Sequence, residues 1–99
     1  MKPMRARVTV WSVSEDEFVL LEEETHRRFA EWKSIPNLLE KIWIGSFDRK
    51  YWGAIMCSTN HKPIDCTKQI NIGEHVTGRS PILDQEFIVI EHLVGGESL

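Results

Sequence analysis

Two apolar runs separated by a four-residue turn are the feature that most constrains the fold of this chain. Leu38 to Gly45 and Lys50 to Cys57 are rich in β-branched and aromatic residues, and Ser46 to Arg49 between them is polar. Two such runs around a short turn predict an antiparallel β-hairpin. Gly53, inside the second run, indicates either a bulge or the close approach of another group at that point.

A strand and a helix are predicted before the hairpin. Residues 5–13 alternate in polarity with the period of two that is typical of a strand. Ser14 and Glu17 then form a capping-box pattern, which predicts the start of a helix. Apolar residues at helical spacing extend this helix from about residue 15 to residue 33, and Pro36 ends it.

A second helix and a last strand are predicted after the hairpin. Residues 64–76 fit a short amphipathic helix only loosely, and Gly78 suits its C-cap. Glu86 to Val94 reads as a strand with two apolar faces, so both faces should be covered. The predicted order is that of an α+β domain of βαββαβ type over residues 1–99, with helices on one face of a four-stranded antiparallel sheet. A symmetric partner is the simplest cover for the other face, which predicts a homodimer packed sheet to sheet.

Composition excludes several classes of protein. The 99 residues suit one domain, and the net charge of −3 without a basic stripe argues against a nucleic-acid partner. No stretch approaches the roughly 18 apolar residues of a membrane helix, so no membrane partner is expected. The two cysteines and the absence of a secretory signal pattern predict a cytoplasmic protein with reduced thiols.

The hairpin also carries a family resemblance. Residues 36–45 (PNLLEKIWIG) and 48–56 (DRKYWGAIM) resemble the hairpin of the YdhR-like monooxygenases, and residues 71–81 resemble the stretch before the last strand in related small proteins. This family belongs to the dimeric α/β-barrel superfamily. The resemblance implies a ferredoxin-like fold, a homodimer, and oxygenation of a small aromatic or polyketide-like substrate without a cofactor. It transfers no catalytic residue to this chain, and residues 57–65 depart from its pattern.

Aromatic residues are the candidates for binding a small hydrophobic or aromatic ligand. A cofactor-independent oxygenase needs an apolar pocket, a base, and donors that stabilise an anion. Lys41 shares a strand face with Trp43, so it either lines a cavity or lies at a wet edge of the sheet. Four aromatic side chains either line the pocket or fill the core and the dimer interface, namely Trp11, Trp43, Tyr51 and Trp52.

Three residues are candidates for the chemistry itself. His26, at the edge of the apolar helix stripe, and His92, in the predicted last strand, are candidate bases because the pKa of histidine lies near neutrality. A surface position for His26 and a dimer-interface position for His92 are the alternatives. Arg79 is a candidate clamp for an anionic substrate, and a loop salt bridge is its alternative.

Metal chemistry is not expected. The spacing of Cys57, His61, Cys66 and His75 matches no zinc pattern, and Cys57 suits a buried thiol. Three functions therefore stay open: a cofactor-independent monooxygenase, an isomerase or cyclase that works by proton transfer, and a non-catalytic binding or dimerisation module. On this scaffold, fold analogy alone does not decide between them.

Overall fold

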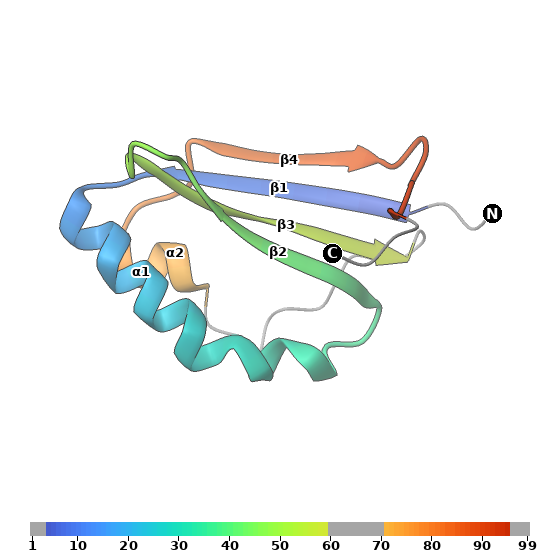
Figure 1. The fold of residues 1–99 in the computed structure, drawn as a ribbon, viewed down its shortest axis with the longest axis horizontal. Helices are drawn as coiled ribbons and strands as arrows, with labels where there is room; N and C mark the ends of the chain where they lie inside the picture. Colours follow the sequence, from blue (N-terminus) through green and yellow to red (C-terminus); the bar gives the residue numbers. More distant parts are fainter. Residues whose placement is uncertain (1–3, 60–70, 96–99) are drawn as a thin grey trace.

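The computed structural model describes residues 4–59 and 71–95 (Figure 1). The described elements follow the predicted βαββαβ order, with a 3₁₀ helix added after the first helix. They are β1 (Met4–Ser12), α1 (Glu15–Arg28), η1 (Phe29–Ser34), β2 (Leu38–Gly45), β3 (Tyr51–Thr59), α2 (Ile72–Thr77) and β4 (Leu83–Ile88).

The strands form one antiparallel sheet in the order β2-β3-β1-β4. Both helices lie on the same side of this sheet, and no described element covers its other side (Figure 1). The arrangement confirms the predicted ferredoxin-like fold. None of the described helices is long and apolar enough to span a membrane.

The β2–β3 hairpin forms as its sequence predicts. β2 has the predicted bounds, and the turn that follows is held by the Ser46 hydroxyl. This hydroxyl donates to Asp48 Oδ1 at 2.7 Å and accepts from the backbone N–H groups of Lys50 and Tyr51 at 3.2 and 3.0 Å. Hydrogen bonds from a side chain of this kind replace the backbone hydrogen bonds between strands where the chain reverses direction.

Gly53 is a point of close approach and not a bulge. Its pairing with Val10 continues the regular register between β1 and β3. A Cβ atom added to Gly53 would collide with the backbone oxygen of Thr9 and would lie 3.1 Å from the Cα of Val10. The alternative of a close approach is therefore confirmed, and the irregularity in the hairpin lies between Leu38 and Glu40 instead.

The predicted first helix is correct at its start and too long at its end. Ser14 Oγ accepts from the backbone N–H of Glu17 at 3.2 Å, and Glu17 Oε1 accepts from the backbone N–H of Ser14 at 2.9 Å, so the capping box is confirmed. The α-helix ends at Arg28, and residues 29–34 continue as 3₁₀ turns. This tighter segment places Trp32 under the sheet, where only 7% of its surface is exposed.

The second helix is shorter than predicted. Asn71 caps α2 by accepting from the Glu74 backbone N–H at 3.2 Å, and Gly78 ends it in the left-handed region at φ 67°. The C-cap prediction for Gly78 is confirmed. The predicted portion at residues 64–70 lies outside the described residues.

The prediction for the last strand is wrong in its position. β4 starts at Leu83 and ends at Ile88, and the apolar residues beyond it do not continue the strand: Ile90 and Leu93 are 81% and 94% exposed. The physical reason is a diagonal ion pair between the side chains of Arg7 on β1 and Asp84 on β4, which draws a polar stretch into the sheet: in the register, Arg7 lies opposite Glu86 and Asp84 opposite Thr9. Residues 86–94 are exposed in the single chain except for the half-buried Val89, so the described residues of this chain do not cover them, and cover by a partner stays a prediction.

The two sides of the sheet differ in their environment. The core lies on the helix side and consists of Trp11, Val13, Phe18, Leu21, Trp52 and Ile72. We call the other side the open face; its apolar members are Val8, Val10, Ile42, Ile44, Ile55, Leu83 and Phe87. Four of these side chains, those of Ile42, Ile44, Leu83 and Phe87, are between 38% and 51% exposed.

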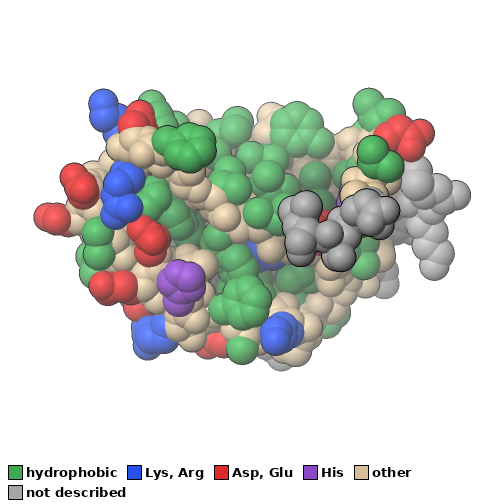
Figure 2. Space-filling model, in the orientation of Figure 1, with side chains coloured by type: hydrophobic (Ala, Val, Ile, Leu, Met, Phe, Trp, Pro, Cys, Tyr) green, Lys and Arg blue, Asp and Glu red, His purple; other side chains and the backbone are tan. Residues whose placement is uncertain are grey.

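Charged side chains gather at one end of the molecule. Figure 2 shows acidic and basic side chains around the start of α1, while apolar side chains spread across the middle of the same view. Arg49 explains part of this cluster: it ion-pairs with Glu22 at 3.3 Å and lies 4.5 Å from the ring centre of Phe18. The hairpin turn is thereby fixed against α1.

Candidate functional site

A cavity of about 530 Å³ lies on the helix side of the sheet, where α2, η1 and residues of all four strands meet. All four tryptophans of the chain line it: Trp11 from β1, Trp32 from η1, Trp43 from β2 and Trp52 from β3. Its size is that of a small-molecule site, and its aromatic lining suits a flat apolar ligand. Trp11, Trp43 and Trp52 were predicted to line a pocket, and Trp32 was not among the candidates.

Strand alternation explains why these residues meet. Trp11 on β1 pairs directly with Trp52 on β3, and Trp43 on β2 pairs with Ala54 on β3. Directly paired residues point to the same side of a sheet. The small Ala54 side chain, between larger neighbours, leaves space above the middle of the sheet.

Trp11 is the most constrained of the four tryptophans. Its ring centre lies 5.7 Å from that of Trp52, and its Nε1–H donates to the backbone oxygen of Arg79 at 3.0 Å. A Cβ atom on Gly73 of α2 would lie 2.6 Å from the Trp11 ring. The absence of a side chain at position 73 therefore lets α2 close over the indole, which is only 3% exposed.

Lys41 points into an aromatic corner of the cavity. Its Nζ lies 2.9 Å from the ring centre of Trp32 and 5.0 Å from that of Trp43. The two indoles meet edge to face, with centres 6.3 Å apart. The sequence left two positions open for Lys41, a cavity wall or a wet edge of the sheet. In the structure Lys41 lines the cavity and is half-buried there. Ring faces stabilise a cation in such a position.

An ion pair forms the opposite wall. Arg7 Nε and Nη2 donate to the two carboxylate oxygens of Asp84 at 2.8 and 2.7 Å. The bond to Arg7 holds the pKa of Asp84 below its ordinary value, so this carboxylate is charged at neutral pH. Both residues line the cavity, and neither was singled out from the sequence.

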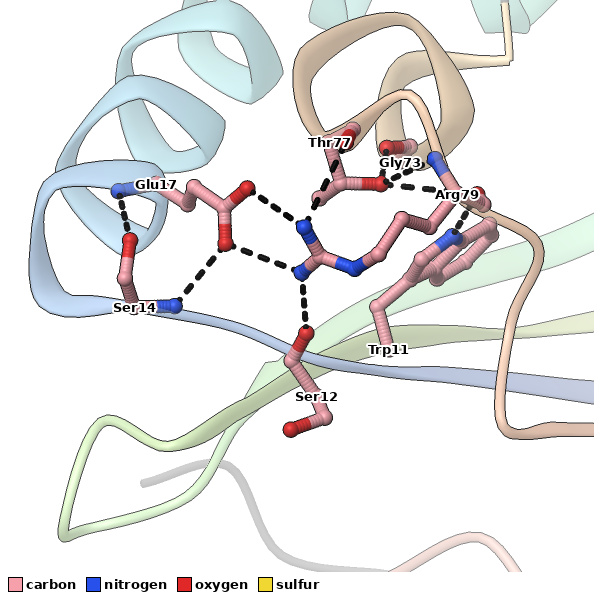
Figure 3. A network of polar contacts seen from close by, with 7 residues as sticks. All are labelled: Trp11, Ser12, Ser14, Glu17, Gly73, Thr77 and Arg79. Atoms are coloured by element: carbon pink, nitrogen blue, oxygen red, sulfur yellow. Dashed lines mark hydrogen bonds and ion pairs between the residues drawn. The ribbon is translucent and has the colours of Figure 1, made fainter.

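Arg79 belongs to a structural network beside the cavity (Figure 3). Its guanidinium donates to both carboxylate oxygens of Glu17 at 2.9 and 3.0 Å and to the backbone oxygen of Ser12 at 2.7 Å. The side chain thus joins the start of α1, the end of β1 and the segment after α2. Arg79 does not line the cavity, although Ser80 and Pro81 beyond it do. Its position fits the salt-bridge alternative and not the predicted anion clamp.

This network makes the stability of the fold depend on pH. The hydrogen bonds from Arg79 and from the Ser14 backbone lower the pKa of Glu17 from 4.5 to about 2. A carboxylate whose pKa is lower in the folded chain stabilises the fold above its unfolded pKa, and this contribution disappears as the pH falls from about 4.5 to about 2.

We expect Glu17→Gln to flatten this part of the pH dependence. Glutamine can keep the cap on Ser14 but removes the charge, so the free energy of unfolding at pH 7 should fall by about 1–2 kcal/mol. Urea unfolding between pH 7 and pH 2 measures both effects. Glu23→Gln, at an exposed acid of the same helix, is the matched control. An acid dependence of Glu17→Gln equal to that of the wild type would contradict the assignment.

The structure places neither predicted histidine at the cavity. His26 is exposed on α1. His92 lies beyond β4, so the prediction of a strand position for it is wrong; its Nε2 is 4.0 Å from Glu40 Oε2. The described part of the cavity wall contains no histidine.

Tyr51 also lies away from the cavity. It is 44% exposed and lines a small hollow with Val10 and Ile44. The alternation of β3 explains the difference, because Tyr51 and Trp52 are neighbours in a strand and point to opposite sides. Tyr51 therefore does not line this cavity, whereas Trp52 does.

The cysteine and histidine pattern gives no cluster among the described residues. No group of three or more metal-ligand side chains forms within residues 4–59 and 71–95. His61 and Cys66 lie outside these ranges. Cys57 is half-buried on β3, and burial together with the charge of Glu40 raises the pKa of its thiol. A raised pKa disfavours the reactive thiolate.

Comparison with known proteins places the fold among solved structures. No protein-family model matches the chain, and no curated protein sequence matches it. A protein from Nitrosomonas europaea assigned as an antibiotic biosynthesis monooxygenase is similar over 90% of each chain, with a TM-score of 0.62 and 14% sequence identity. The likeness is one of fold.

Two further solved structures are similar over nearly their whole length. The monooxygenase ActVA-Orf6 of Streptomyces coelicolor, solved with the ligand nanaomycin D, has a TM-score of 0.56 and 14% identity over 98% of this chain and 94% of its own. A dimeric ferredoxin-like protein from an uncultured marine organism has a TM-score of 0.58 and 8% identity over 97% and 95%. At these identities the comparisons establish the ferredoxin-like fold and leave the activity open.

Proposed function

We propose that this chain is a cofactor-independent monooxygenase that acts on a small, flat aromatic or polyketide-like substrate. The observation that carries the proposal is the cavity walled by all four tryptophans. Structural neighbours described as monooxygenases, and the resemblance of the hairpin to the YdhR-like family, support the choice of reaction. We also propose a cytoplasmic location, because a chain with two cysteines suits a compartment in which thiols stay reduced.

The reaction would use electrons from the substrate itself. A ring CH₂ group of the substrate loses two hydrogen atoms and gains one oxygen atom of O₂, so that it becomes a carbonyl. The second oxygen atom leaves as water together with the two hydrogen atoms. The tryptophans would exclude water and hold the substrate flat. Asp84 is one carboxylate of the cavity wall that could take the proton, and Lys41 could stabilise the resulting anion.

We also propose a homodimer that forms through the open face. The apolar side chains of this face have no covering element among the described residues, and a solved neighbour of the same fold is described as dimeric. A contiguous apolar surface of this kind marks an association site. In a dimer packed sheet to sheet, the two cavities would lie on the outer sides of the paired sheets.

Oxygen consumption tests the proposed reaction. With anthrone as a probe substrate, we expect uptake of one O₂ for each anthraquinone formed, and no turnover under nitrogen. Trp43→Ala should lower kcat/KM at least tenfold, because it removes one wall of the cavity. Phe47→Ala is the matched control, since Phe47 is fully exposed on the hairpin turn. No O₂ uptake above the uncatalysed rate with anthrone or 1,8-dihydroxyanthrone would count against the oxygenase.

One observation favours a non-catalytic binding protein as the second candidate. The described lining contains no histidine, and its Asp84 is held in a two-bond pair with Arg7, which makes it a weak base. This candidate predicts binding of anthrone without turnover in air. Turnover that continues under nitrogen would instead indicate an isomerase or cyclase.

A further inference from the structure

One row of directly paired residues crosses the floor of the cavity. Ala54 on β3 pairs with Trp43 on β2 and with Thr9 on β1. Thr9 pairs in turn with Asp84 on β4. All four residues line the cavity, as expected for directly paired residues, which point to the same side of a sheet. Along this row the floor therefore changes from an indole, through two small side chains, to a carboxylate.

The two small side chains in the middle of the row leave room for a ligand. Residues two positions apart in a strand point to the same side of the sheet. The neighbours of Ala54 and Thr9 on the cavity side all have longer side chains and also line the cavity: Trp52, Met56, Arg7 and Trp11. A flat ring system therefore finds room over Ala54 and Thr9, where it lies across the direction of the strands.

The Thr9 hydroxyl is a hydrogen-bond donor on this floor. Thr9 is half-buried, and its hydroxyl makes no hydrogen bond to another described residue. The neighbouring Asp84 carboxylate, which two hydrogen bonds from Arg7 hold in its charged form, only accepts hydrogen bonds. Of the side chains of Thr9 and Asp84, only that of Thr9 can therefore donate to a carbonyl oxygen of a ligand.

We propose that Thr9 makes the cavity specific for polycyclic ring ketones: the rings lie over Ala54 with one edge towards Trp43, and the Thr9 hydroxyl donates to the carbonyl oxygen at the other edge. The Cβ atoms of directly paired residues lie about 5 Å apart, so the same ring also lies beside the Asp84 carboxylate. This inference rests on the proposed function only in that the cavity must admit a flat aromatic molecule. It adds the chemical class of the ligand and the residue that recognises it.

Binding of a matched pair of ligands tests the inference. The probes are 9-fluorenone and fluorene, which have the same three fused rings and differ by one carbonyl group. Equilibrium dialysis of the whole chain at pH 7 under nitrogen measures both dissociation constants without oxidation of the fluorene. Thr9→Val keeps the shape of the side chain and removes the hydroxyl, so it should weaken the binding of fluorenone about fivefold and leave that of fluorene within about twofold. Thr9→Ser should keep the affinity for fluorenone, because it retains the hydroxyl.

Thr59→Val is the control variant. Thr59 lies on β3 at an odd number of positions from Ala54, so strand alternation turns it to the other side of the sheet. The same substitution there should change neither dissociation constant, and an equal loss of fluorenone binding in Thr59→Val would overturn the inference. An unchanged affinity of Thr9→Val for fluorenone, or an equal weakening of both ligands, would also overturn it and leave the aromatic site standing. No binding of either ligand to the wild type would count against the aromatic site and the inference together.

Discussion

Replacing Gly53 with alanine should destabilise the fold by about 3 kcal/mol or more. Gly53 lies in the central part of the sheet, where β3 pairs with β1. The added Cβ would collide with the backbone oxygen of Thr9 and crowd the Cα of Val10 at 3.1 Å. A side chain could rotate away from such a contact, but a paired strand backbone cannot. The strands must separate locally, which weakens the ladder on which the cavity walls stand.

Urea unfolding followed by tryptophan fluorescence measures this effect. With a slope of about 1 kcal/mol per molar urea, the loss corresponds to a midpoint about 3 M lower. Wild type and variant should be compared at one protein concentration, because association shifts the midpoint. Gly95→Ala is the matched control, since a Cβ there meets no atom within 4 Å. A midpoint for Gly53→Ala within 0.5 M of the wild type would refute the predicted clash.

Local signals in the sequence predicted the parts of the fold that depend on neighbours in the chain. The capping box at Ser14 and the left-handed cap at Gly78 need only residues within one helical turn. The β2–β3 hairpin likewise depends on a short turn. The 3₁₀ segment after Arg28 was missed because its apolar spacing continues that of a helix, and periodicity alone does not distinguish the two.

The last strand was misplaced because its stability depends on a distant partner. Asp84 and Gln85 look like a loop in the sequence, and the stretch from Glu86 to Val94 looks like a strand. In the fold, Arg7 and Arg5 of β1 pair with Asp84 and Glu86 at 2.7 and 3.8 Å. A pairing between residues nearly 80 positions apart leaves no local pattern that a single sequence could reveal.

The aromatic walls of the candidate site could be predicted from the sequence, and its ion pair could not. Strand alternation is a local signal, and it was enough to predict that Lys41 and Trp43 share one face of their strand; both line the cavity. Tyr51 was misassigned because its strand face was not separated from that of Trp52. Asp84 could not be found without the correct last strand. His26 was chosen from its place at the edge of the helix stripe and His92 from its place in the predicted last strand, and neither position determines whether the side chain reaches the tryptophans.

The largest effect on assembly is expected from a charge at the centre of the open face. Ile55 pairs directly with Val8 on one side and with Ile42 on the other, so it lies amid the apolar side chains. In a dimer packed through this face, Ile55→Arg would bury a guanidinium without a partner. Such a burial costs several kcal/mol, so the dissociation constant should rise more than a hundredfold.

Sedimentation velocity should find the wild type as a dimer and Ile55→Arg as a monomer at the same micromolar concentration. Leu20→Arg is the matched control, because Leu20 is an apolar residue of α1 with 49% exposure that lies outside the open face. Circular dichroism should remain that of a folded α+β protein for both variants. A monomeric wild type, or an Ile55→Arg variant that stays dimeric, would show that the open face does not form the interface.

The same variant separates assembly from ligand binding. The cavity lies on the helix side of the sheet, and the proposed interface lies on the other side. Monomeric Ile55→Arg should therefore bind anthrone under nitrogen with an affinity within about threefold of the wild type. If the affinity instead falls together with the dimer, a partner chain must complete or support the site. In that case the dimer would be required for function as well as for covering the apolar face.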